Sequence, residues 1–260
     1  MPEFNDYPRV LISGGGTFLG DQIALALLSA GIEVSLLVRP DKEDLSPELA
    51  NRVNWVAADL WNPASLRGRA RGHTVMIHTV GSIQADNSKG LSLNHLNVMT
   101  ARNAANLAVN GGIQRFINLS TVWGIGLNRS YIKSKREAEG YIIRSGLNTL
   151  TLRLPLIYVR GQERPFIFRM ESFLADTPPF SWFLFRKSGP LPIDTLARAI
   201  TWLVLNPQMK NAILYAPDLR KYSRLLDLSV MADNQDDDDD TKPRRPQKMN
   251  NEDVPFGWTP

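Results

Sequence analysis

A glycine cluster enclosed by a strand pattern and a helix pattern constrains the fold of this chain most strongly. The apolar run Val10–Ile12 enters "SGGGTFLG", and a helical pattern rich in alanine and leucine follows and ends near Gly31. A second apolar run, "IEVSLLVRP", comes next, so residues 9 to 38 have the length of one βαβ unit. Exposed backbone N–H groups and the helix dipole favour phosphate at such a turn. The cluster predicts a nucleotide loop, and the alternative is a strand-to-helix turn that binds nothing.

The glycine spacing departs from the full dinucleotide fingerprint at one position. Gly14 would permit the tight turn, and Gly20 would let the helix pack against the strand. Thr17 stands where the G-x-x-G-x-x-G pattern has the glycine that lets the backbone approach a pyrophosphate. The phosphate loop predicted from this stretch comprises Gly14, Gly16, Thr17, Phe18, Leu19 and Gly20.

The same alternation continues along most of the chain. Strand-like runs occur at 34–38, 53–57, 74–78, 115–119, 149–154 and 212–215, with helical patterns between them, two of which end at glycine. Such alternation predicts a Rossmann-type, doubly wound parallel α/β sheet. We expect one NAD(P)-binding domain over residues 1–232, with a small C-terminal substrate portion from about residue 155, and a disordered acidic tail over 233–260.

Composition narrows the classes of function and partner. Residues 233–260 hold eight acidic and four basic residues, which leaves 26 basic and 18 acidic residues, a net charge of +8, for residues 1–232. The bases are scattered without interleaved aromatics, so we expect no nucleic-acid partner. Cysteine is absent and the three histidines lack metal-ligand spacing, so no metal site is expected. No run of 18 apolar residues and no signal-peptide core occurs, which favours a soluble protein.

A second stretch, "FINLSTVWGIGLNRSYIKSKREAEGY", carries candidate catalytic groups. Tyr131 and Lys135 lie four residues apart at the start of a helical pattern, on one helix face, and Ser120 ends the preceding strand pattern. A nearby ammonium stabilises a phenolate, so we expect Lys135 to lower the pKa of Tyr131 and to bind the nicotinamide ribose. Tyr131 would transfer the proton and Ser120 would hold the substrate oxygen. The alternative is an exposed helical turn without a catalytic role.

Several motifs together resemble a known family. "GGGTFLG", "AADLWNP", "VMIHTVG", "NVMTARN", "LST", "YIKSKREAE", "TLRLPLIY" and "LPIDTLARAI" resemble the atypical and extended short-chain dehydrogenases/reductases, the NAD-dependent epimerase/dehydratase-like proteins, over about residues 9 to 220. Within that superfamily the chain is most similar to ubiquinone-biosynthesis accessory proteins and to the nucleotide-binding accessory subunit of respiratory complex I. The resemblance implies one set of cofactor contacts beyond the glycine loop: Asp59 and Leu60 at the adenine, Thr79, Val80 and Gly81 along the channel, Asn97 ordering the central helix, and Pro155, Leu156 and Ile157 at the nicotinamide.

The end of the second strand pattern bears on the choice of cofactor. An acidic residue there would accept a hydrogen bond from the ribose 2′-hydroxyl, but this chain has Arg39, followed by Lys42. These bases favour NADP(H) over NAD(H), and the alternative for Arg39 is a solvated base.

Three functions follow from these observations. They are an NADP(H)-dependent oxidoreductase acting on a small apolar or quinone-related substrate, an NAD(P)H-binding accessory subunit without turnover, and a sugar-nucleotide epimerase/dehydratase. The short C-terminal portion argues against the third.

The aromatic and basic segment 164–193 would cap an apolar pocket or touch a membrane surface, and the alternative is a loop and helix that cover the core. We therefore expect a small-molecule substrate as a partner, with a protein complex and a peripheral membrane contact as further candidates. The related proteins indicate a mitochondrion, a bacterium or a plastid as the location.

Overall fold

The computed structural model describes residues 8–42, 46–86, 88, 90–123, 127–160 and 189–240, with side chains up to residue 231. Seven parallel strands form one sheet in the order β3-β2-β1-β4-β5-β6-β9. They are β1 (Arg9–Ser13), β2 (Glu33–Val38), β3 (Asn54–Ala57), β4 (Val75–His78), β5 (Arg115–Thr121), β6 (Asn148–Leu154) and β9 (Ala212–Leu214). The strand order reverses between β1 and β4, which is where open α/β sheets bind ligands. The predicted fold class is confirmed.

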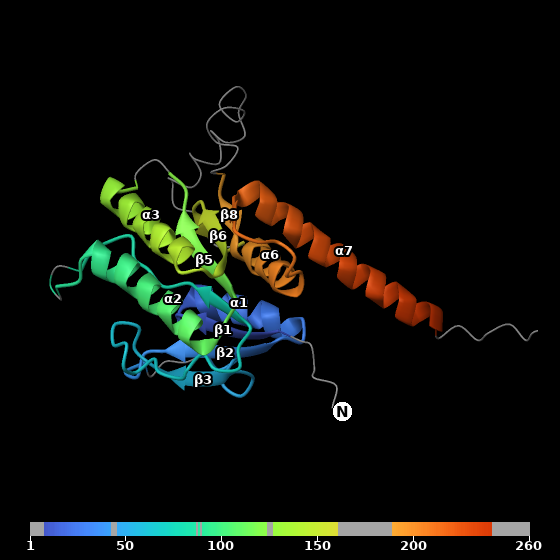
Figure 1. Ribbon diagram of the computed structural model, residues 1–260. Helices are drawn as coiled ribbons and strands as arrows, with labels where there is room; N and C mark the ends of the chain where they lie inside the picture. The colour runs from blue at the N-terminus through green and yellow to red at the C-terminus, as the bar shows by residue number, and fades with distance from the viewer. Residues whose placement is uncertain are drawn as a thin grey trace, which may run out of the picture. The chain divides into compact units, whose positions relative to one another are not determined.

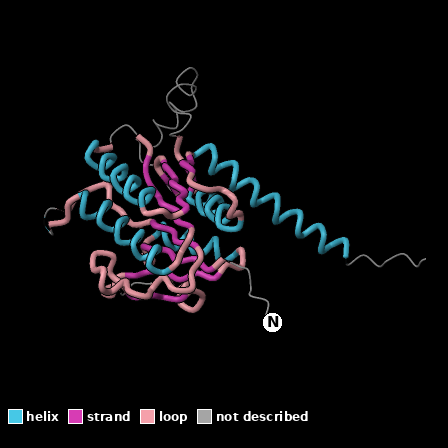
Figure 2. Tube along the Cα trace, in the orientation of Figure 1, coloured by secondary structure: helices cyan, strands magenta, loops and turns pink. Residues whose placement is uncertain are grey.

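Helices cover both faces of the sheet (Figures 1 and 2). On one face lie α1 (Phe18–Ser29) and α6 (Ile193–Leu205), which pack against each other. On the other lie α2 (Thr100–Gly111), which continues a π-helical turn η2 (Asn94–Met99), and α3 (Arg129–Arg144). The short strands β7 (Ile157–Tyr158) and β8 (Leu191–Pro192) form a separate two-stranded sheet.

Alternate residues of each strand enter two hydrophobic clusters. Val10 and Ile12 pack with α1 and α6, whereas Leu11 between them packs with α2 and α3. Because both faces are covered, β1 and β4 carry continuous apolar runs, Val10–Ile12 and Val75–Ile77. In β5 and β6 buried polar residues alternate with the apolar ones. The edge strand β3 is only partly buried, and it begins one residue later than the sequence pattern predicts.

The helix ends follow local sequence signals. Gly112 caps α2 in the left-handed conformation at φ 76°, as its C-terminal glycine predicts. Helix α3 is capped at Ser145, and Gly146 follows with φ 81°. Both glycines allow the chain to turn back toward the next strand.

The C-terminal boundary differs from the prediction. Helix α7 (Ala216–Asp240) begins in the unit Met1–Leu226 and continues into a second unit, Asp227–Pro260. Residues 233–240, predicted to be disordered, are therefore helical here. Helix propagation costs less than nucleation, so a helix can extend into a polar sequence. Residues 241–260, and all of the aromatic segment up to residue 188, lie outside the described residues.

No helix in the described part of the chain is both long and apolar enough to cross a bilayer. Among the same residues, no three His, Asp or Glu side chains gather as metal ligands.

Candidate nucleotide-binding and active site

Two glycines, one in the loop between β1 and α1 and one in the first turn of α1, stand where a larger side chain would clash. Gly14 has φ +90°, and a Cβ there would lie 2.5 Å from the Thr79 hydroxyl oxygen. A Cβ at Gly20 would lie 2.4 Å from the carbonyl oxygen of Gly14. Glycine at position 14 therefore lets the loop approach the end of β4, and glycine at position 20 lets α1 approach the loop. Both glycines thus have the packing role that their spacing suggests.

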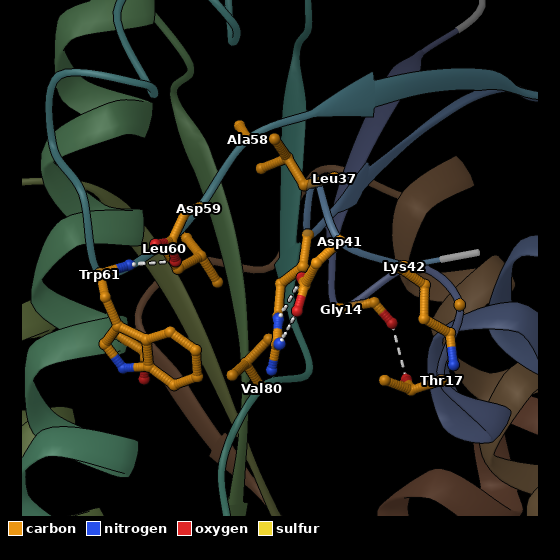
Figure 3. A pocket seen from close by; sticks show the side chains of 14 residues that line it. Gly14, Thr17, Leu37, Asp41, Lys42, Ala58, Asp59, Leu60, Trp61 and Val80 are labelled. Carbon is orange, nitrogen blue, oxygen red and sulfur yellow. Dashed lines mark hydrogen bonds and ion pairs between the residues drawn. The ribbon is translucent and has the colours of Figure 1, made fainter. Parts of the chain in front are cut away.

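Thr17, the departure from the glycine pattern, is the N-cap of α1. Its hydroxyl accepts a hydrogen bond from the Gly20 N–H at 3.2 Å. It donates to the Gly14 carbonyl at 2.6 Å (Figure 3). The Thr17 side chain therefore links the start of the loop to the first turn of α1. The turn is kept although the middle glycine is absent.

Asp21 also takes part in this loop, which the glycine spacing alone did not predict. Its carboxylate accepts a hydrogen bond from the Gly16 N–H at 2.9 Å. Burial raises the pKa of Asp21, and the bond to Gly16 and the charge of Lys42 oppose that rise. A phosphate group at Gly16 would have to compete with this carboxylate. The signal in the sequence is an acidic residue in the first turn of the helix.

A cavity of about 330 Å³ lies beside the loop. Of the predicted residues it is lined by Gly14, Gly16, Thr17, Arg39, Lys42, Asp59, Leu60 and Val80 (Figure 3). It is also lined by six residues that the sequence did not predict at the cofactor: Gly15, Leu37, Asp41, Ala58, Trp61 and Thr100. Asp59 accepts a hydrogen bond from the Trp61 N–H at 2.9 Å, which fixes the segment after β3.

Arg39 lines this cavity but is already paired. Its guanidinium forms two hydrogen bonds to the Asp41 carboxylate, one of them from Nε at 2.9 Å, and lies 5.8 Å from the ring centroid of Trp61. Arg39 and Asp41 are both exposed, with side-chain exposures of 58% and 64%. Arg39 can therefore turn toward a ligand only by giving up or sharing Asp41.

A second cavity, of about 340 Å³, brings together the residues that the sequence placed near the chemistry. Its lining includes Leu19, Thr79, Gly81, Ser120, Tyr131, Lys135, Pro155, Leu156 and Ile157. Val80 lines the first cavity while its neighbours Thr79 and Gly81 line the second. The two cavities thus adjoin the same segment after β4, as the two halves of a dinucleotide site would.

Lys135 is buried at the floor of the second cavity. Its ammonium lies 3.3 Å from the Leu119 carbonyl oxygen and 3.4 Å from that of Val80. Burial lowers the pKa of Lys135 to about 8, and the charge of Glu139 opposes that shift. A Cβ at Gly81 would lie 2.5 Å from the ammonium nitrogen, so glycine at position 81 leaves room for it.

The pKa of Tyr131 shifts in the direction opposite to the prediction. Burial raises the pKa of its phenol, and a hydrogen bond with the Thr121 side chain and the charge of Arg136 only partly oppose the rise. The predicted lowering by Lys135 is therefore not found. The physical reason is desolvation, because Tyr131 is only 8% exposed.

Ser120 is also engaged differently from the prediction. Its hydroxyl donates to the Glu139 carboxylate and accepts from Arg136 at 3.2 Å, so its proton points to a buried carboxylate and not to a substrate. The hydroxyl that interacts with Tyr131 belongs to the next residue, Thr121.

Glu139 is the centre of a buried ionic network. It is 4% exposed and pairs with Arg136 from its own helix and with Arg153 of β6 at 2.7 Å. Arg136 also donates to the Thr121 carbonyl at 2.7 Å. The network therefore holds the end of β5 beside α3. Glu139 follows Tyr131 and Lys135 at four-residue spacing, which could have revealed it, whereas the position of Arg153 has no local signal.

Three of the predicted cofactor residues line neither cavity. Phe18 is 58% exposed, and Gly20 serves packing. Asn97 is buried in η2, where its amide donates to the Ser82 carbonyl at 2.9 Å and accepts from the Ser82 N–H at 3.0 Å. Asn97 thus shapes the cavity wall, in agreement with an ordering role.

Comparison with known proteins supports this description. The chain is 34% identical over 158 residues to a protein named ceramide reductase of Caulobacter vibrioides, covering 58% of this chain and 47% of that protein. It is 28% identical over 171 residues to a chloroplastic protein of Arabidopsis thaliana, covering 60% of this chain and 54% of that protein. The chain spans about half the length of these relatives.

The crystal structure of the Bordetella bronchiseptica enzyme WbmH in complex with NAD+ has the same fold. It superposes with a TM-score of 0.58 at 20% identity, covering 87% of this chain and 82% of that one. A family model described as NAD(P)H-binding matches residues 14–168, which include the glycine loop, both cavity walls and the Tyr131–Lys135 helix. The chain therefore belongs to the NAD(P)H-binding family, and its fold is that of the WbmH enzyme.

Proposed function

We propose that this protein is an NADP(H)-dependent reductase of an apolar carbonyl compound. The observation that carries the proposal is the opening of Tyr131 and Lys135, from one face of α3, into a cavity beside the glycine loop. The membership of the NAD(P)H-binding family supports the same class of oxidoreductase.

The residues present fit a dinucleotide. Gly14 and Gly20 allow the tight turn between β1 and α1, and this turn places the N-terminus of α1 beside the first cavity. Arg39 and Lys42 line the adenine-side cavity, where guanidinium and ammonium groups would bind a 2′-phosphate. These two bases support NADP(H) as the cofactor, with Asp41 as the competing partner of Arg39.

The chain's own groups suit a reduction at neutral pH. A bound reduced nicotinamide supplies the hydride that the carbonyl carbon receives. The phenol of Tyr131 is protonated at neutral pH and would donate this proton to the carbonyl oxygen. Burial raises its pKa, so the donation depends on stabilisation of the tyrosinate by nearby groups. The product is an alcohol, and the tyrosinate regains a proton from water. Thr121 orients the phenol, and Lys135 would bind the ribose and support the tyrosinate.

The lining of the second cavity favours an apolar substrate. Ile83, Leu119, Val122, Leu127 and Leu154 surround the polar groups. A relative named ceramide reductase supports a substrate with lipid-like chains, and a quinone-related ring is the other member of the apolar class.

The alternative is a cofactor-binding subunit without turnover, in a quinone-biosynthesis or respiratory complex of the mitochondrion. The specific observation in its favour is that the Ser120 hydroxyl donates its hydrogen bond to the Glu139 carboxylate and not into the cavity. In either case the partners would be small molecules or proteins, or a membrane surface, and not nucleic acid.

One substitution separates the two functions. Tyr131→Phe keeps the ring and removes only the hydroxyl, so NADPH binding measured by fluorescence titration should be unchanged. NADPH oxidation with a panel of long-chain ketones and quinones should fall about 10²-fold to 10⁴-fold, as expected when a general acid is lost. Tyr141→Phe, on the same helix and outside the second cavity, is the matched control.

Full turnover by Tyr131→Phe would refute the reductase mechanism. If wild-type protein binds NADPH but oxidises it with none of these substrates, the non-catalytic subunit becomes the better description.

A further inference from the structure

A third cavity, of about 470 Å³, lies outside the nucleotide site. It is formed by the segment "SLRGRARGH" after β3 and by α2. Arg67 and Arg71 from the segment and Arg102 from α2 line it, together with the amides of Asn106 and Asn110. We call it the arginine hollow. It shares no lining residue with either of the two cavities described above.

The positive charge of the hollow has no acidic counterpart in its walls. No Asp or Glu lines it, and none of its three arginines has an ion pair recorded among the residues that the structure describes. All three arginines are exposed. Three guanidinium groups around one concave surface repel each other and concentrate positive potential there. An anion in the hollow would relieve that repulsion.

Neighbouring contacts hold the walls in place. The Arg102 guanidinium lies 5.8 Å from the ring centroid of Tyr141. The Tyr141 hydroxyl donates to the Asn106 amide oxygen at 2.9 Å, which leaves the NH2 group of Asn106 as a donor. Asn103 donates to the Leu60 carbonyl at 2.7 Å and so ties α2 to the segment after β3. A ligand would therefore meet the Arg102 guanidinium and the Asn106 NH2 group in fixed positions.

We propose that the arginine hollow binds the phosphate group of an anionic ligand through Arg67, Arg71 and Arg102. The planar guanidinium fork matches phosphate oxygens in pairs, and phosphate is the anion that such clusters bind best. Leu66 and Leu107, both buried, provide an apolar floor for the part of the ligand that carries the phosphate. The ligand class is thus a phosphate ester, either a free metabolite or a phospholipid headgroup. This site is independent of the proposed reductase function.

The test measures two phosphate sources on the full-length protein. Inorganic pyrophosphate is titrated by calorimetry, and vesicles of phosphatidylcholine with phosphatidylglycerol are co-sedimented with the protein. Each measurement compares wild type with the double variant Arg71→Gln/Arg102→Gln and with Arg52→Gln, an exposed arginine outside the hollow. The pyrophosphate titration is repeated with saturating NADPH, because pyrophosphate can also occupy the glycine loop.

We expect the double variant to weaken binding at least about 10-fold in one of the two measurements, since each lost charge-assisted contact has roughly that effect. Arg52→Gln should bind like wild type, and the effect should persist with NADPH present. A loss seen with pyrophosphate assigns a soluble ligand, and a loss seen only with vesicles assigns a lipid headgroup. Equal binding by wild type and the double variant in both measurements would overturn the proposal, whether or not the protein turns over NADPH. So would an equal loss in Arg52→Gln, because the effect would then reflect net charge alone.

Discussion

Replacing Lys135 by methionine should leave the protein as stable as wild type or make it more stable. Lys135 is only 7% exposed, and burial lowers its pKa from 10.5 to about 8. At 1.36 kcal/mol per pKa unit, keeping this ammonium charged costs the folded state about 3 kcal/mol. Methionine has a similar length and no charge, so the substitution removes that cost.

Lost hydrogen bonds offset part of this gain. The ammonium donates to the carbonyls of Leu119 and Val80, at 3.3 and 3.4 Å. Both bonds are longer than an ordinary N–H···O hydrogen bond, so losing them costs about 0.5–1.5 kcal/mol each, about 1–3 kcal/mol together. The net change in the free energy of unfolding at pH 7 is therefore a stabilisation of about 0–2 kcal/mol. Most substitutions of buried residues destabilise by about 0.5–3 kcal/mol, so the expected sign is distinctive.

The pH dependence gives the sign an independent check. Below pH 8, Lys135 is charged in both states and its cost is constant. Between about pH 8 and 10.5 the unfolded state binds more protons than the folded state, so wild type gains stability relative to Lys135→Met as the pH rises. Any excess stability of the variant at pH 7 should therefore shrink or reverse over this window.

Urea unfolding at pH 7, 8, 9 and 10 measures both effects, with Lys133→Met as the control. Lys133 is exposed on the same helix, so its variant should follow wild type at every pH. NADPH titration of Lys135→Met should show weaker binding, because the ribose contact that we propose for Lys135 would be lost. A destabilisation of more than about 2 kcal/mol at pH 7, or a difference that does not change with pH, would refute this account of Lys135.

Three further predictions follow from the same structure. Glu139→Gln should destabilise by about 1.5–3 kcal/mol in urea unfolding, since it leaves two partly buried arginines without their anion, whereas exposed Glu137→Gln should have almost no effect. Equal stability of both variants would show that the network is not structural. Asp41→Asn should tighten NADPH binding several-fold and leave the affinity for NADH unchanged, because it frees Arg39 from its ion pair. An equal effect on both affinities would show that Arg39 does not select the cofactor. Gly20→Ala should lower the free energy of unfolding by about 1–3 kcal/mol and weaken NADPH binding, because its Cβ would lie 2.4 Å from the Gly14 carbonyl oxygen. A variant that unfolds and binds NADPH like wild type would show that the loop can relax.

The sequence alone determined the order and type of the main elements. Strands buried on both faces tend to carry continuous apolar runs, and this local property is visible in runs such as Val10–Ile12. The glycines at positions 14 and 20 follow from turn and packing geometry within one βαβ unit. The four-residue spacing of Tyr131 and Lys135 placed both on one helix face, and both line the same cavity. Each of these features depends on residues close together in the chain.

The tertiary structure decided the partners of these side chains. Ser120 is engaged by Glu139, which also pairs with Arg153 of another strand. Burial by distant elements, and not the neighbouring Lys135, determines the pKa of Tyr131. The arginine hollow likewise forms only where the segment after β3 meets α2. Hydrogen-bond partners and desolvation depend on groups brought together by the folded chain, and no local pattern in the sequence specifies them.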